Sequence, residues 1–165
     1  VSGSGRVFDG DMIIYMLAKY YKSRGALRDD TVVGTSHTNM AIERALGELG
    51  IRFIRTDIGD KYVLAKLVEK NLSLGGEQSG HIILKDLHTT GDGILSAIAV
   101  ANMLIKTGKT LDELFDVTLY PQTNINVTVG DKFKIMNSLE LSRELTRIQN
   151  ELSGTGRVMV RASGG

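Results

Sequence analysis

Short apolar strand patterns alternate with amphipathic helix patterns along the first two thirds of the chain. Thr31–Thr35 and Ile51–Thr56 are typical of buried strands, and each is followed by apolar residues at helical spacing. This alternation predicts a doubly wound α/β domain, in which helices flank a mostly parallel sheet. Only a few residues separate the strand patterns Leu72–Leu74 and His81–Leu84, which permits a hairpin but no parallel crossover. We therefore expect a mixed sheet with one antiparallel strand.

Acidic residues and glycines mark where the expected helices begin and end. Asp9 and Asp11 precede an apolar stripe that stops near Gly25, and negative side chains stabilise a helix N-terminus. Two carboxylates without a third ligand nearby make a poor Mg²⁺ site, so a helix cap explains this pair better than a metal loop. The other expected helices begin at Ser36–Thr38, Gly59–Tyr62 and Thr89–Gly93, and the last continues to Gly108.

The composition changes after a short helical segment at Leu111–Phe115, and Pro121 is the only proline. We expect residues 1–118 to form the α/β domain and residues 119–165 to begin a second, truncated α+β unit. The chain ends soon after an apolar strand pattern, so we expect a fragment of a longer protein. Its segment from Gln122 onward either pairs its strand edges with another copy or is poorly ordered. The expected elements of the second unit are strands at 122–129 and 156–160 and an amphipathic helix at 138–152.

The charge balance excludes several classes of partner. With 20 Lys and Arg against 19 Asp and Glu, the net charge is +1, so no overall field attracts nucleic acid or an anionic membrane. No apolar run approaches the roughly 20 residues that span a bilayer. The chain contains no cysteine, which removes disulfides and thiolate chemistry and is compatible with the cytoplasm, where we expect the protein to reside.

The densest group of polar, chemically useful side chains lies between the two hairpin strands. Three glycines there let the main chain turn sharply and let a ligand approach closely. The Glu77 carboxylate offers two acceptors, while the Gln78 amide and the Ser79 hydroxyl both donate and accept hydrogen bonds. Such a set suits the adjacent hydroxyls of a sugar. A simple solvated hairpin is the alternative, because Gly and Ser are common turn residues. The candidate binding residues are Gly76, Glu77, Gln78, Ser79, Gly80 and His81.

Two further stretches are candidates for binding phosphate. Free N–H groups at a helix N-terminus hold anions, and Lys61 adds positive charge to the helix that opens at Gly59. Arg161, Ser163 and Gly164 combine a guanidinium, a hydroxyl and free N–H groups after a strand pattern. The alternatives that the pattern leaves open are an ordinary surface lysine and an arginine in a frayed terminus.

A metal-dependent hydrolase is a competing interpretation, since the chain has three histidines, His37, His81 and His88. Zinc needs about three protein ligands that converge on one point. His81 and His88 flank a strand and a loop and share no helical face, and His37 is expected to be a capping or surface histidine at a strand-to-helix turn. The sequence therefore predicts no metal site.

Taken together, these stretches resemble the α-D-phosphohexomutase superfamily, and within it the bacterial phosphoglucosamine mutases. The resemblance covers nearly the whole chain in the family's order and spacing, and Gln78 points to the glucosamine branch. The stretches that carry it are Gly59–Tyr62, Gly75–His81, Thr89–Gly93 and Gly156–Gly164.

The resemblance implies a place and a role for these residues. Residues up to about Val117 would be the third, sugar-binding domain of a four-domain enzyme, and the remainder would begin the fourth, phosphate-binding domain. The hairpin residues would bind sugar hydroxyls near the transferring phosphate, and the last residues would bind the non-reacting phosphate. The implied substrate-binding residues are Gly76, Glu77, Gln78, Ser79, Gly80, Arg161, Ser163 and Gly164, and the implied catalytic residues are His81 and Lys61.

The implied reaction interconverts glucosamine 6-phosphate and glucosamine 1-phosphate through a phosphoserine and a bisphosphate intermediate. The family's phosphoserine loop and its Asp-Gly-Asp-x-Asp-Arg Mg²⁺ loop are absent from this sequence. Because phosphoryl transfer needs phosphate, metal and nucleophile together, we expect Mg²⁺ and the missing domains in the full-length enzyme and no activity from this chain alone. The alternatives are a phosphomannomutase or phosphoglucomutase fragment and a stand-alone, non-catalytic sugar-phosphate binding module.

Overall fold

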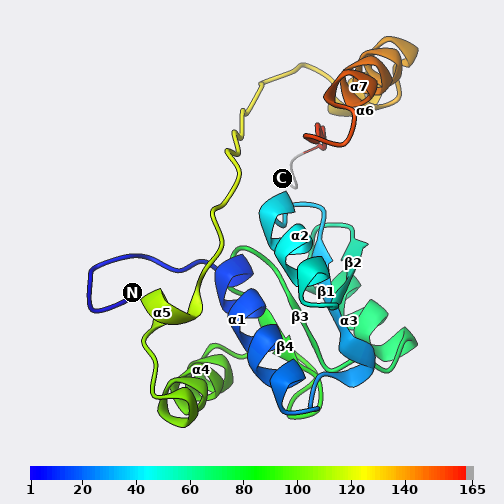
Figure 1. Cartoon of the computed structure of the whole chain (residues 1–165). Coiled ribbons are helices and arrows are strands. Elements are labelled where there is room, and N and C mark those ends of the chain that lie inside the picture. The colour runs from blue at the N-terminus through cyan, green and yellow to red at the C-terminus, as the bar shows by residue number, and fades with distance from the viewer. Residues whose placement is uncertain (163–165) are drawn as a thin grey trace. The chain divides into compact units, whose positions relative to one another are not determined.

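A computed structural model describes residues 1–162 of the chain (Figure 1). Ser163 and Gly164, two of the predicted phosphate-binding residues, lie outside the described residues. The chain divides into two compact units, Val1–Pro121 and Gln122–Gly165. Each unit is described by itself below.

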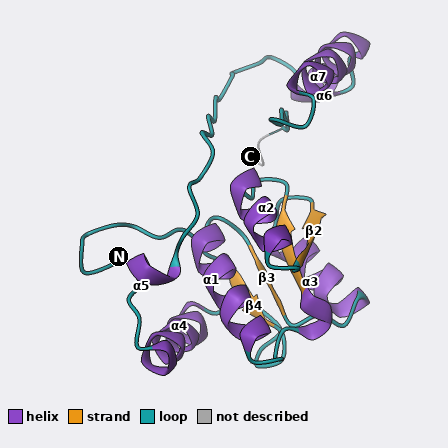
Figure 2. Ribbon diagram, in the orientation of Figure 1, coloured by secondary structure: helices purple, strands orange, loops and turns teal. Residues whose placement is uncertain are grey.

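The first unit contains a four-stranded sheet in the order β2-β1-β3-β4 (Figure 2). Strand β1 pairs in parallel with both β2 and β3, whereas β3 and β4 form an antiparallel hairpin with Leu74 opposite Leu84 and Gly76 opposite Ile82. The predicted mixed sheet, mostly parallel with one antiparallel strand, is confirmed. The strands are β1 (Thr31–Thr35), β2 (Arg52–Thr56), β3 (Leu74–Gly76) and β4 (Ile82–Leu84).

Helices cover both faces of this sheet. Alternate residues of a strand point to opposite faces, so Val32 belongs to the core cluster that contains residues of α1, α2 and α4, while its neighbour Val33 belongs to the cluster with α3. Figure 1 shows α1 and α2 side by side over one face. The helices of this unit are α1 (Gly10–Ser23), η1 (Arg28–Asp30), α2 (Met40–Glu48), α3 (Asp60–Glu69), α4 (Gly93–Thr107) and α5 (Leu111–Leu114).

The N-caps explain why the helices begin where they do. The Asp9 carboxylate accepts a hydrogen bond from the Met12 N–H at 3.0 Å, and Asp92 caps α4. The cap of α2 is Asn39, so the expectation of a cap within Ser36–Thr38 is wrong. The Thr38 N–H donates back to the Thr35 carbonyl, so these residues form a turn of their own before the helix begins.

Asn39 also fixes the end of the first unit. Its side-chain amide donates to the Tyr120 carbonyl at 2.9 Å, and its side-chain oxygen accepts from the Tyr120 N–H at 3.2 Å. Arg44 donates to the Tyr120 hydroxyl at 2.8 Å and lies over its ring. These contacts hold the main chain one residue before Pro121, where the first unit ends.

The second unit contains two helices among its described residues, α6 (Lys132–Met136) and α7 (Leu139–Leu152). The predicted helix at 138–152 is confirmed, with Ser138 as its N-cap. The predicted strands at 122–129 and 156–160 are wrong, because neither segment pairs with another strand in the described part of the chain. Ile125 is 79% exposed, so its apolar side chain is not buried against a second layer. An extended segment without a paired strand and a buried face is not stable as a β-strand.

Candidate functional site

The carboxyl ends of β1, β2 and β3 lie at one edge of the sheet, because these strands are parallel. Three connections therefore leave the sheet together: the β1–α2 turn, the β2–α3 turn and the Gly75–His81 loop of the hairpin. Open α/β sheets bind their ligands at this edge. The structure thus brings the candidate sugar-binding loop to the same edge as the N-terminus of α3.

Glu77 joins two of these connections. Its Oε1 atom accepts a hydrogen bond from the Gly59 N–H, the N-cap residue of α3, at 2.9 Å. Glu77 is buried, so the alternative that the hairpin's polar residues are merely solvated does not hold for this carboxylate. One oxygen is thereby oriented by the protein, while Oε2 faces the loop.

The remaining polar groups of the loop line up beside Oε2. His81 Nδ1 lies 3.7 Å from Glu77 Oε2 and 3.2 Å from the Ser79 hydroxyl oxygen. The His81 and Ser79 side chains are both exposed, and Gly80 turns the chain between them with a positive φ of 98°. The Gly80 N–H donates to the Glu77 carbonyl, which closes the turn. The loop therefore presents a carboxylate, a hydroxyl and an imidazole together.

Gln78 points away from this group, toward the start of α1. Its side-chain amide donates to Asp9 Oδ2 at 3.3 Å, and its main-chain carbonyl accepts from the Gly10 N–H at 3.0 Å. A Cβ at Gly10 would lie 2.0 Å from the Glu77 carbonyl oxygen, so only glycine permits this approach. Asp9 and Gly10 support the loop, and the sequence pattern identified them as a helix start alone.

Gly76 has a structural requirement of its own. A Cβ at this position would lie 2.5 Å from the His81 carbonyl oxygen and 3.0 Å from the Cα of Ile82. The close pairing of β3 with β4 therefore requires a residue without a side chain at position 76. Its predicted contact with a substrate stays a prediction.

The two predicted basic contacts are exposed. Lys61 lies in the first turn of α3, two residues after Gly59, whose N–H donates to Glu77. The Lys61 ammonium lies 4.8 Å from the centroid of the Tyr62 ring. Lys61 therefore lies two residues after the contact of Gly59 with Glu77, and no buried partner among residues 1–162 is seen to fix its ammonium. Arg161 is exposed in the second unit.

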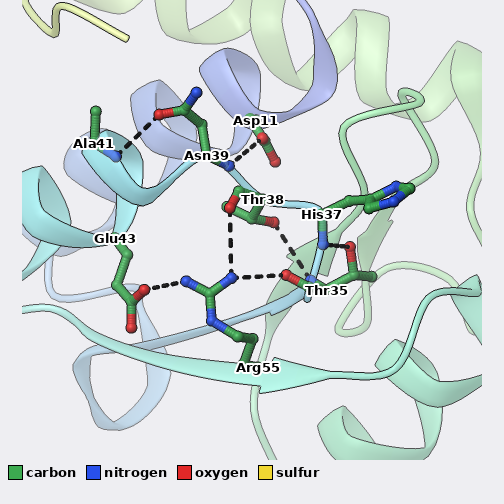
Figure 3. A network of polar contacts seen from close by, with 8 residues as sticks. All are labelled: Asp11, Thr35, His37, Thr38, Asn39, Ala41, Glu43 and Arg55. Carbon is green, nitrogen blue, oxygen red and sulfur yellow. Dashed lines mark hydrogen bonds and ion pairs between the residues drawn. The ribbon is translucent and has the colours of Figure 1, made fainter. Parts of the chain in front are cut away.

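The β1–α2 turn is held by an arginine that the sequence analysis did not identify. Figure 3 shows Arg55 of β2 forming an ion pair with Glu43 and donating to the carbonyls of Thr35 and Thr38. The His37 N–H donates to the Thr35 hydroxyl at 3.2 Å. His37 belongs to this turn, and Asn39, not His37, caps α2.

Asp11 is a buried carboxylate behind the same turn (Figure 3). Its Oδ2 accepts from the Asn39 N–H at 2.9 Å, while Oδ1 has no hydrogen-bond partner among the described residues. Burial raises the pKa of Asp11 to about 6, and the nearby Asp9 carboxylate adds to the rise against the hydrogen bond from Asn39. The group changes charge in the physiological range.

The carboxylates at the start of α1 do not fit a Mg²⁺ site. Asp9 accepts from Met12 and Gln78 with its two oxygens, and Asp11 accepts from Asn39 with one, so three of the four oxygens are directed at protein donors and not at a common point. Within residues 1–162 no group of three His, Asp or Glu side chains is arranged to hold a metal ion. The same residues include no helix long and apolar enough to cross a membrane.

Comparison with known proteins assigns this arrangement to a family. Residues 9–120 match the family described as phosphoglucomutase/phosphomannomutase, alpha/beta/alpha domain III. The phosphoglucosamine mutase of Nitrosospira multiformis is 51% identical over 163 residues, which are 98% of this chain and 35% of that protein. The phosphoglucosamine mutase of Bacillus velezensis is 44% identical over 99% of this chain and 37% of its own length. The chain thus spans little more than a third of these relatives.

Solved structures share the fold. The chain is similar to the N-acetylphosphoglucosamine mutase of Aspergillus fumigatus with a TM-score of 0.73 and 18% identity, over 88% of this chain and 36% of that one. It is similar to an N-acetylglucosamine-phosphate mutase with a TM-score of 0.74 and 18% identity, over 94% of this chain and 38% of that one. With residues 9–120 matching over most of its length, the chain belongs to the phosphoglucomutase/phosphomannomutase family and carries its α/β/α domain III.

Proposed function

We propose that this chain is the sugar-recognition part of a phosphoglucosamine mutase, a phosphohexomutase that interconverts glucosamine 6-phosphate and glucosamine 1-phosphate. The observation that carries the proposal is the buried Glu77 carboxylate, held by the Gly59 N–H with its second oxygen beside Ser79 and His81. The names of the relatives at 44% and 51% identity support the glucosamine substrate. In the longer enzyme the reaction would proceed through a phosphoserine and a bisphosphate intermediate.

The loop would form hydrogen bonds to sugar hydroxyls that occupy the same positions in both orientations of the substrate. A carboxylate accepts from two adjacent hydroxyls, and a serine hydroxyl donates or accepts as the sugar requires. Glu77 is fixed before the substrate arrives, so little entropy is lost on binding. The Glu77 carboxylate and the Ser79 hydroxyl suit both orientations that a bisphosphate intermediate must adopt, because these groups bind the sugar hydroxyls and neither phosphate.

Phosphate binding is assigned to other positions. The Lys61 ammonium would attract the transferring phosphate, and His81 would stand beside it as a proton carrier. Arg161, with Ser163 and Gly164, would bind the other phosphate. Mg²⁺, when bound by the longer enzyme, supplies positive charge to the transferring phosphoryl group.

Two narrower assignments follow from the same proposal. Gln78 distinguishes a glucosamine phosphate enzyme from a phosphomannomutase or phosphoglucomutase, although in this structure its side chain contacts Asp9. A sugar-phosphate enzyme without cysteine is compatible with the cytoplasm, and we propose that location. The second candidate function is a non-catalytic sugar-phosphate binding module.

The test is an amide-resolved NMR titration of the chain with glucosamine 6-phosphate. We expect shifts at Gly59 and within Gly75–His81, with weak, millimolar binding, and smaller shifts with glucose 6-phosphate. Inorganic phosphate should leave Gly59 and the loop unchanged and shift the amide of Lys61 instead. Loop shifts of equal size with phosphate alone would contradict sugar recognition by this loop.

Glu77→Ala should weaken sugar binding by about tenfold or more, because it removes charge-assisted hydrogen bonds to hydroxyls. Glu77→Gln separates recognition from folding, since the amide oxygen can still accept from the Gly59 N–H. Glu69→Ala, an exposed carboxylate on α3, is the matched control and should bind as before. In the longer enzyme Glu77→Ala should lower kcat/KM by about 100-fold; an unchanged kcat/KM would refute the assignment, and tight binding without turnover would favour the binding module.

A further inference from the structure

Asp9 joins the first helix to the candidate sugar-binding loop and uses a different oxygen for each. Its Oδ1 accepts the capping hydrogen bond from the Met12 N–H at 3.0 Å, and its Oδ2 accepts from the Gln78 side-chain amide at 3.3 Å. Gln78 is the residue between Glu77 and Ser79, whose side chains are the proposed sugar contacts. The geometry at Asp9 therefore affects what this loop offers to a ligand.

The contact with Asp9 fixes which way the Gln78 amide is turned. A carboxylate only accepts hydrogen bonds, whereas a side-chain amide has one accepting and one donating end. The Nε2 end must therefore face Asp9, and the Oε1 end faces the opposite way. Gln78 is half-exposed, and within residues 1–162 its Oε1 atom has no hydrogen-bond partner. The loop thus presents an acceptor here that is oriented before a ligand binds.

An acceptor beside a negative charge favours a cation as its ligand. In the described part of the chain Asp9 forms no ion pair with a Lys, Arg or His side chain, so no side-chain cation balances its charge. An ammonium group has three donors and no acceptor. It can therefore satisfy the Gln78 oxygen and is also attracted by the Asp9 carboxylate, whereas a neutral hydroxyl gains only the hydrogen bond.

We propose that Asp9 is a positioning residue for amino-sugar selectivity, because it turns the Gln78 oxygen toward the ammonium at position 2 of glucosamine phosphate. This inference rests on the proposed function of the chain. Position 2 of the ring is adjacent to the hydroxyl at position 3, so a ring bound through its hydroxyls at Glu77 and Ser79 brings its position-2 group to the residue between them. Turning the ring around moves position 2, so the contact belongs to one of the two orientations of the substrate.

Asp9→Asn tests the proposal without removing the helix cap. The asparagine oxygen still accepts from the Met12 N–H, so its NH₂ group takes the place of Oδ2 and faces Gln78. Gln78 must then turn its oxygen toward position 9 and its NH₂ group outward, where it repels an ammonium but still donates to a hydroxyl. We expect the preference for glucosamine 6-phosphate over glucose 6-phosphate, measured by NMR titration as a ratio of dissociation constants, to fall about tenfold.

Two further chains separate this role from a structural one. Combining Asp9→Asn with Gln78→Glu exchanges donor and acceptor: the asparagine NH₂ group donates to the introduced carboxylate, whose second oxygen faces outward, so the preference for the amino sugar should return. Asp131→Asn is the matched control and should leave the preference unchanged. Asp131 caps α6 by accepting from the Lys134 N–H at 3.0 Å, the length of the Asp9 cap.

The Nε2 protons of Gln78 supply a readout that needs no ligand. In the unaltered chain they donate to the Asp9 carboxylate, and in Asp9→Asn they are turned outward, so their exchange with water should be faster in the variant. Equal exchange rates in the two chains would overturn the proposed orientation of the amide.

The sugar titrations separate this inference from the proposed function. Loop shifts with glucosamine 6-phosphate, with the same preference in the unaltered and the Asp9→Asn chains, would overturn the inference and leave the proposed function intact. A preference that falls in Asp9→Asn and does not return with Gln78→Glu would indicate a structural role and overturn the inference as well. Absence of loop shifts with either sugar would refute the proposed function and this inference together.

Discussion

Gly10→Ala is expected to destabilise the first unit by about 3 kcal/mol or more, a large effect for one methyl group. The added Cβ would lie 2.0 Å from the Glu77 carbonyl oxygen and 2.8 Å from the Gly80 nitrogen. Both are backbone atoms of the hairpin loop, so no side chain can move aside to make room. Urea unfolding, extrapolated to water, measures the loss.

The matched control is Gly47→Ala in the exposed part of α2. A Cβ at Gly47 meets nothing within 4 Å, so this variant should be more stable by about 0.5–1 kcal/mol, because alanine restricts the unfolded chain. Gly10→Ala should also shift the amide signals of Gly75–His81, whereas Gly47→Ala should not. If the two variants unfold at similar denaturant concentrations, the proposed close support of the loop by α1 is wrong.

The free energy of unfolding should fall by about 2–3 kcal/mol between pH 4 and pH 7 through Asp11 alone. Burial raises the pKa of this carboxyl from 3.8 to about 6 in the folded state, so the folded chain binds the proton more tightly than the unfolded chain does. The stabilisation is complete below about pH 4 and is lost as the pH rises through 6. Above pH 6 an ionised, buried carboxylate remains with one oxygen unpartnered among the described residues.

Asp11→Asn isolates this contribution. The amide has no charge to titrate, and its oxygen can still accept from the Asn39 N–H. All other titrating groups are common to both chains, so their effects cancel in the difference between the two unfolding free energies. That difference should shift in favour of the variant by about 2 kcal/mol from pH 4.5 to pH 7.5. Parallel pH profiles would show that Asp11 does not titrate in this range.

Local patterns predicted the first unit well, because its signals are carried by neighbouring residues. Asp9 and Asp92 cap the helices that they precede, and the short connection between Leu74 and Ile82 allows only a hairpin. The strand expected at 122–129 failed for the opposite reason. An alternating apolar and polar sequence forms a strand only when a neighbouring strand pairs with it, and the described residues of the second unit contain no such strand.

The sequence identified the polar residues of the candidate site but not the contacts that support them. The sequence identified Glu77 by its residue type and its glycine neighbours, yet nothing local to Glu77 indicates the hydrogen bond from Gly59, 18 residues away. Arg55 and Gly10 were missed for the same reason, since their partners come from other elements. A glycine between two acidic residues at a helix start was the one available signal of a close approach.

The hydrogen bonds at Tyr120 give the first unit a defined mechanical end. The Asn39 amide, which holds both main-chain groups of Tyr120, and Arg44 transmit displacements of the segment that follows Pro121 to α2. Asn39 is also the cap of α2, so a pull on this segment is applied to the start of a helix whose other end stays packed. Tension along this segment would therefore be applied to the first turn of α2.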